Sequence, residues 1–452
     1  MHDLHGLTLS TGNNAAAEAF NRTLRAYLGY RKDIAEHLKA TLEADPSFAL
    51  AHCAKGYFMM LTYKQANVAL AAQARDAAKR LAAAATPREQ AHVQALSAWI
   101  DGDLDGALAA WEQTLRAYPT DVLAMRLAHF NYFWLGRPRE MRASLERIAQ
   151  QWSPQLAGYG ILLGCHAFAL EECGEYAAAE RAGREAVELD PADLWATHAV
   201  AHVLEMQGRR DEGIAFLGGL EANWAEGNNL VHHLWWHRAM YHLERRESDA
   251  VLDLYDRRIR DLAAPLVAAQ PDLYIDVQNA ASLLFRLERQ GVDVAYRWTE
   301  LADKAEARIG DCLSAFTLPH WMMALAAAGR EHACQRMLGA MRDFGRGTAS
   351  TAALVRDVAV PVCEAVWCHR RGEYQQCLQL MRPVLGDMHR LGGSHAQQDV
   401  LEQLFLDAAT RAQQADAVRA LLERVTAAHP VPPGRRVGYA DAARRFSASP
   451  LH

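Results

Sequence analysis

Apolar residues recur along this chain with the period of about 3.6 residues that marks an amphipathic helix. The alanine-rich segments 69–85 (ALAAQARDAAKRLAAAA) and 294–309 (VAYRWTELADKAEARI) both place their apolar positions on one helical face. No segment shows the strict two-residue alternation that is typical of a half-buried strand. The pattern therefore predicts an all-α protein.

Turn signals divide these helices into repeating units. Gly29, Gly102 and Gly174 are each followed 17 residues later by a proline. The intervals from Gly102 to Gly136 and from Gly174 to Gly208 are both 34 residues, which is the period of the tetratricopeptide repeat. We therefore expect a tetratricopeptide-repeat-like helical solenoid, a fold that can curl around a central pocket.

Degenerate repeats continue downstream. Arg246 stands where a turn glycine is expected, and Gly329 and Gly372 end further hairpins. The turn signals indicate about ten helix pairs, in one continuous solenoid over residues 1–429. The segment PVPPGRRVG then begins a C-terminal tail, residues 430–452. Its prolines exclude a regular helix at the start of the tail. We expect the later part of the tail to pack back as a cap or to fray. Small residues occupy the positions of closest helix approach, namely Ala95, Ala107, Ala167, Ala179, Ala201 and Gly213.

Charge and cysteine content exclude several classes of function. The 452 residues carry a formal net charge of -6 without a sustained Lys/Arg run, so we expect neither a nucleic acid nor a membrane as partner. The first residues lack the pattern of a signal peptide and no apolar run reaches the length of a membrane span, which favours a cytoplasmic protein. The eight cysteines form no C-x-x-C pair and read as core residues.

Histidine is the unusual component. The chain has 20 histidines, and six of them fall within the 45 residues that contain THAVAHVLEM and VHHLWWHRAMYHLE. When the turn residue Gly208 is position 15 of its repeat, His198, His202 and Glu205 are positions 5, 9 and 12 and share one face of a helix. In such repeats this face lines the ligand groove, and the next helix is expected to direct His233 and His237 into the same space.

Three interpretations of this cluster remain open. The histidines pack structurally against Trp195, Trp235 and Trp236, or they bind a divalent transition metal, or they line a metal-free polar pocket with acid–base capacity near neutral pH. The metal candidates are His198, His202, His233 and His237, and the candidates for a catalytic role are His198, His202, Glu205 and His237.

Two further residues are candidates for ligand binding. His320 falls on the corresponding face of its own repeat, although a histidine directly after a proline also suits a helix start. Asp399 lies four residues after His395, where both side chains either reach the groove or decorate the first turns of a helix. Ser394 and Gln397 match a capping box at that helix start. Phosphate-loop, dinucleotide-binding and G-x-S-x-G motifs are absent from the sequence, which leaves nucleotide and serine-hydrolase chemistry without support.

Five segments together resemble the tetratricopeptide repeat protein 38 family of bacteria and animals: PTDVLAMRLAHFNYFWLG, THAVAHVLEM, HHLWWHRAMY, VRDVAVPVCEA and LGGSHAQQDV. The resemblance covers most of the chain and implies a helical-repeat fold, but no catalytic assignment. By this similarity, the residues in the family's recurring motifs are His198, His202, Glu205, His233, His237, His320, Gln397 and Asp399.

Two functions follow from these patterns. In the first, a histidine-rich pocket binds a small polar ligand or a divalent transition metal; the sequence does not decide whether that ligand is transformed. In the second, the solenoid is a scaffold that holds a partner protein or peptide in its groove.

Overall fold

The computed structural model describes residues 1–294 and 296–446, and in this part of the chain all regular structure is helical. Two isolated bridges, His2–Thr8 and Arg31–Gly227, are its only β-type pairings. The predicted all-α fold is therefore confirmed. Backbone contacts divide the chain into two units, one comprising residues 1–200, 220–230 and 348–351, the other comprising residues 201–219, 231–347 and the chain from 352 onwards.

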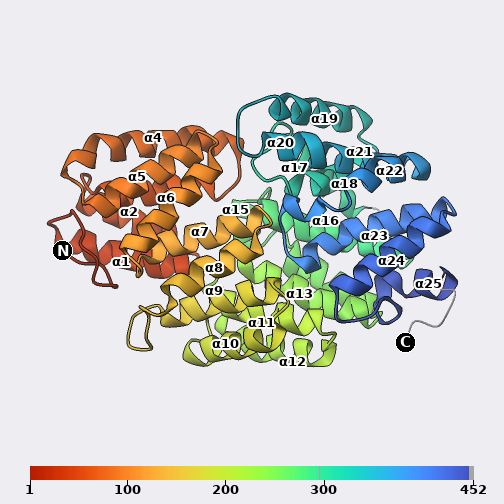
Figure 1. Ribbon diagram of the computed structural model, residues 1–452, viewed down its shortest axis with the longest axis horizontal. Helices are drawn as coiled ribbons and strands as arrows, with labels where there is room; N and C mark the ends of the chain where they lie inside the picture. Colours follow the sequence, from red (N-terminus) through yellow and green to blue (C-terminus); the bar gives the residue numbers. More distant parts are fainter. Residues whose placement is uncertain (295, 447–452) are drawn as a thin grey trace. The chain divides into compact units, whose positions relative to one another are not determined.

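Unit 1 is a series of helical hairpins in which consecutive helices pack as pairs (Figure 1, red to yellow). The pairs are α1 with α2, α3 with α4, α5 with α6, α7 with α8, and α9 with α10. This pairing is the helical-repeat arrangement that the turn spacing predicts. The helices are α1 (Asn14–Leu28), α2 (Ile34–Ala44), α3 (Ala49–Met60), α4 (Gln65–Leu81), α5 (Pro87–Ile100), α6 (Leu104–Ala117), α7 (Val122–Trp134), α8 (Pro138–Ala149), α9 (Tyr159–Glu172) and α10 (Tyr176–Leu189).

The boundary between the units falls inside α11 (Leu194–Met206), after Val200. Unit 2 continues with further packed pairs, among them α17 with α18, α21 with α22, and α23 with α24. Its helices are α12 (Arg210–Leu220), α13 (Leu230–Glu244), α14 (Ser248–Leu254), α15 (Pro265–Ala269), α16 (Tyr274–Arg289), α17 (Arg297–Ala307), α18 (Thr317–Ala327), α19 (Glu331–Gly345), α20 (Ala352–Leu354), α21 (Val360–Arg370), α22 (Tyr374–Met381), α23 (His395–Arg411), α24 (Ala415–Ala428) and α25 (Val437–Phe446). Two π-helical turns, Tyr255–Ile259 and Val355–Ala359, interrupt the regular pattern.

The predicted turn positions have a left-handed backbone. Gly102, Gly136, Gly174 and Gly208 have φ angles of 84°, 63°, 80° and 68°. Arg246 adopts the same conformation with φ 61°, which agrees with its expected place in a degenerate repeat. In the first repeat the left-handed residue is not the glycine at position 29 but the tyrosine that follows it, with φ 52°.

Close approach of helices explains the small residues. The five alanines singled out by the repeat register are fully buried. At Gly213 in α12, a Cβ atom would lie 2.4 Å from Cζ of Tyr241 in α13. Because real Cβ contacts do not reach this distance, α12 and α13 pack closely only with glycine at this position.

The C-terminal segment packs against the end of unit 2. After a short 3₁₀ turn at Pro433–Arg435, α25 contacts both α23 and α24. Residues 447–452 of the predicted tail lie outside the described residues. Among the described residues, no helix is both long enough and apolar enough to cross a membrane.

Candidate histidine site

Three buried imidazoles gather in unit 2. His202 comes from α11, and His233 and His237 come from α13, one helical turn apart; their exposed fractions are 0%, 2% and 0%. The ring centroids of His202 and His237 are 4.4 Å apart, and those of His233 and His237 are 4.7 Å apart. One ring nitrogen of each lies within 4.8 Å of the others. The structure thus contains the histidine cluster that the sequence indicated.

Two of the three rings are held by side-chain oxygens. Nδ1 of His237 lies 2.7 Å from Oε2 of Glu205, which is on α11 one turn after His202. Nδ1 of His233 lies 3.0 Å from Oδ1 of Asn279, a buried residue of α16. Since each of these bonds engages Nδ1, it fixes the direction in which the opposite nitrogen, Nε2, points.

Burial determines the charge of the cluster. It lowers the pKa of His237 to about 3 and holds the pKa values of His202 and His233 well below the ordinary value of histidine. Repulsion from neighbouring imidazoles lowers the pKa values of His202 and His233 further. Burial also raises the pKa of Glu205 to about 8. The three rings are therefore neutral at physiological pH, which is the form of histidine that binds metals.

One interpretation of the sequence was that the histidines only pack against tryptophans. The structure shows such packing for part of the cluster. The ring of His233 stacks on Trp236 with centroids 5.2 Å apart and an interplanar angle of 8°. Trp235 instead lies under two guanidinium groups, those of Arg238 and Arg258. Stacking on tryptophan therefore supports the imidazole of His233.

Three further histidines belong to this region of the sequence. His198 precedes His202 by one turn of α11 and belongs to unit 1, where its ring packs against Trp195 and Phe168 at centroid distances of 4.8 and 5.2 Å. Nδ1 of His232 donates to the carbonyl oxygen of Arg258 at 2.6 Å. His242 pairs with Glu247 at the end of α13, with 2.6 Å between Nδ1 and Oε2.

A small cavity adjoins Glu205 within unit 2. Its volume is about 40 Å³, which holds on the order of three water molecules. Met206, Met240 and Val431 supply apolar parts of its wall. The polar lining consists of Glu205, Arg210, Tyr241, Glu244, His395, Asp399, His429 and Arg436. Glu205 therefore connects the histidine cluster to the cavity.

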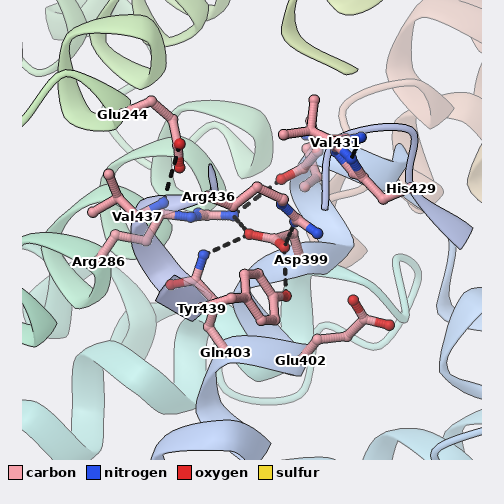
Figure 2. Close-up of polar contacts among 12 residues, drawn as sticks. Glu244, Arg286, Asp399, Glu402, Gln403, His429, Val431, Arg436, Val437 and Tyr439 are labelled. Carbon is pink, nitrogen blue, oxygen red and sulfur yellow. Dashed lines mark hydrogen bonds and ion pairs between the residues drawn. The ribbon is translucent and has the colours of Figure 1, made fainter. Parts of the chain in front are cut away.

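Asp399, a ligand-binding candidate from the sequence, lines this cavity. Figure 2 shows its carboxylate among four donors. The hydroxyl of Tyr439 and the amide of Gln403 each donate at 2.6 Å, the guanidinium of Arg286 donates at 3.3 Å, and that of Arg436 donates as well. Burial alone would raise the pKa of Asp399, but Arg436 and Arg286 outweigh burial and lower it to about 2.

His320, the other additional candidate, does not line the cavity. Its ring is buried in α18, and Nδ1 donates to the backbone oxygen of Phe316 at 2.9 Å. Burial lowers the pKa of His320 to about 4. Ser394 and Gln397 form the predicted capping box at the start of α23, and His395 reaches the cavity.

Sequence reasoning missed three polar residues here. Asn279 and Arg286 belong to α16, and in the sequence they are visible only as polar residues within an apolar helix. Arg436 belongs to the tail, and the sequence PGRRVG shows its charge but does not indicate which residue it contacts.

No family model matches the chain. Among solved structures, the chain is similar to one in a structure of Naa15/Naa10 bound to HypK-THB, with 10% identity and a TM-score of 0.26 over 95% of this chain and 66% of that chain. It is also similar to the P58(IPK) TPR domain, with 11% identity and a TM-score of 0.20 over 88% of this chain and 99% of that chain. At these scores neither similarity bears on the function of this chain.

Proposed function

We propose that His202, His233 and His237 of unit 2 bind a divalent transition metal. The observation that supports this most directly is the pair of hydrogen bonds from Nδ1 of His237 to Glu205 and from Nδ1 of His233 to Asn279. In metal sites, a ligating imidazole typically has its second nitrogen bonded to a carboxylate or another oxygen acceptor, which fixes the ring and makes it a better ligand.

The spacing of the rings suits one ion. Zinc–nitrogen bonds are about 2.0–2.1 Å long, so nitrogens around a tetrahedral ion are roughly 3.3 Å apart. One ring nitrogen of each of the three histidines lies within 4.8 Å of the others, so binding one ion requires the rings to move closer together. Three neutral imidazoles suit zinc, copper, iron or nickel rather than calcium or magnesium.

The proposed ligand set is confined to unit 2 and therefore does not include His198, a residue of unit 1. An ion with three protein ligands keeps a coordination position open for water or a small polar molecule, as in catalytic zinc sites. The cavity beside Glu205 is the adjacent space in unit 2 for such a molecule.

Elemental analysis of the purified protein, before and after incubation with zinc, tests the proposal. We expect about one equivalent of a transition metal that chelator removes and added zinc restores. The H237A variant should take up less than about a tenth of an equivalent. The matched control is H242A on the same helix, whose histidine pairs with Glu247 and should be dispensable. Failure of the wild-type protein to take up zinc, or equal uptake by H237A, would contradict the proposal.

The alternative function, a scaffold for a partner protein, is supported by the helical-repeat fold in general. It predicts that partner binding is unaffected by H237A. Affinity capture with the wild-type protein and with H237A distinguishes the two functions: capture of the same partner by both, without any metal uptake, favours the scaffold.

A further inference from the structure

We propose that the cavity between α11, α13 and the C-terminal segment is a binding site for a short-chain carboxylate, held through Arg436. The site lies entirely within unit 2. This inference goes beyond the proposed metal site and does not depend on it.

The size of the cavity suits a small ligand. About 40 Å³ accommodates the equivalent of roughly three water molecules. An anion of three to five heavy atoms fits in this space. Formate, acetate and propionate fall in this class.

The donors of Arg436 are only partly used. Within the described chain, its guanidinium makes one hydrogen bond, from Nη2 to Asp399, and stacks on the ring of Tyr439 at 4.3 Å. Nε, Nη1 and the second hydrogen of Nη2 therefore remain for a ligand. Because Nη2 shares one edge of the guanidinium with Nε and the other edge with Nη1, one edge keeps two donors, which match the two oxygens of a carboxylate.

A second donor comes from His429. Its Nδ1 accepts a hydrogen bond from the backbone nitrogen of Val431 at 3.0 Å, so the proton of the neutral ring is on Nε2. Burial lowers the pKa of His429 to about 4, which keeps the ring neutral. The residue lines the cavity and offers an N–H donor without adding a charge.

The distribution of charge favours an anion. Arg286 and Arg436 share the single carboxylate of Asp399, and both are at least nine-tenths buried. The two other carboxyl groups of the lining also have partners: Glu244 pairs with Arg210 at 2.8 Å, and Glu205 bonds His237. Because a buried charge is costly without a counter-charge, a carboxylate ligand beside Arg436 stabilises the arginine pair.

The apolar wall distinguishes carboxylates from purely inorganic oxyanions. Met206, Met240 and Val431 give one side of the cavity a surface that suits a methyl or ethyl group. Acetate and propionate can place their oxygens at Arg436 and their carbon tail against these side chains. Bicarbonate and nitrate can use only the donors, so we expect them to bind more weakly.

Isothermal titration of chelator-treated protein with sodium acetate, against sodium chloride at equal ionic strength, tests this inference. For so small a ligand we expect one saturable site with a dissociation constant in the millimolar range, and weaker binding of bicarbonate. R436K keeps a positive charge beside Asp399 but loses the planar fork, and should weaken acetate binding about tenfold. The matched control is R411K, an exposed arginine paired with Asp407 away from the cavity, which should bind acetate as the wild type does.

A crystal of the wild-type protein soaked in sodium acetate gives a readout that does not depend on any variant folding. Density for a planar ligand of four non-hydrogen atoms should lie in the cavity, with its oxygens at Arg436. Absence of saturable acetate binding, equal binding by R436K, or a soaked crystal without such density in the cavity would overturn the inference. The acetate titration uses metal-free protein, and metal uptake is measured in acetate-free buffer. A negative result for the carboxylate site therefore leaves the metal site untouched, and a negative result for the metal site leaves the carboxylate site untouched.

Discussion

At the scale of single residues, Glu205 is the link between the two features of unit 2. Its carboxyl group bonds Nδ1 of His237 and also borders the cavity. A carboxylate in this position orients the imidazole and increases its basicity towards a metal on the opposite nitrogen. Glu205 is therefore a positioning residue in the proposed site rather than a metal ligand.

We expect E205Q to bind zinc about 10- to 100-fold more weakly than the wild type. Burial raises the pKa of Glu205 to about 8 in the metal-free protein, and a bound cation favours the ionised form, which the amide cannot adopt. Competition with a fluorescent zinc chelator measures the difference. The control is E364Q, whose glutamate pairs with Arg342 on the surface. Equal zinc affinity of E205Q and the wild type would show that this hydrogen bond does not support a metal ligand.

Asp399 makes stability depend on pH in a defined direction. Its folded pKa of about 2 lies below the ordinary value of 3.8, so its contribution is complete above about pH 4 and is lost as the pH falls towards 2. The shift corresponds to about 2 kcal/mol. Urea unfolding measured between pH 6 and pH 3 should show a shallower loss of stability in D399N, which lacks this titration, than in the wild type. Parallel pH profiles would contradict the assignment.

At the scale of helices, close packing explains more of the fold than local propensity does. Gly213 is a poor helix former in the middle of α12, yet a Cβ there would overlap the ring of Tyr241. The same helix contains Gly219, where a Cβ would meet no atom within 4 Å. Gly213 therefore tests the packing of the two helices, whereas Gly219 tests only the helix propensity of glycine.

We expect G213A to lower the free energy of unfolding by about 1–3 kcal/mol, because the added methyl group forces α12 away from α13. G219A should leave stability unchanged or raise it by up to about 1 kcal/mol, since alanine favours the helix. Chemical denaturation followed by circular dichroism measures both. Equal effects of the two substitutions would show that α12 and α13 are not in close contact.

The sequence predicted the elements of this fold well, for a physical reason. Each repeat is made by local contacts, and its turn requires a left-handed residue that leaves a visible signal as glycine. Arg246 stands where a turn glycine is expected, and it adopts the same left-handed conformation although its distance from Gly208 exceeds the 34-residue period. The first turn was the exception, because Tyr30 rather than Gly29 adopts the left-handed conformation.

At the scale of the whole chain, the composition of the site was less predictable. Spacing along α11 and α13 was enough to suggest that His202, His233 and His237 converge. It did not show that Asn279 bonds His233, or that Arg436 of the tail reaches Asp399. Both contacts join residues far apart in the sequence, and no local periodicity encodes them.

The central claim is that three histidines of unit 2 form a metal site, and its most direct test is a crystal structure of zinc-loaded protein with data collected at the zinc absorption edge. We predict one anomalous peak about 2.0–2.1 Å from a ring nitrogen of each of His202, His233 and His237, with Glu205 still bonded to Nδ1 of His237. A zinc-soaked crystal without a peak among these rings, or with its metal bound at other residues, would contradict the claim.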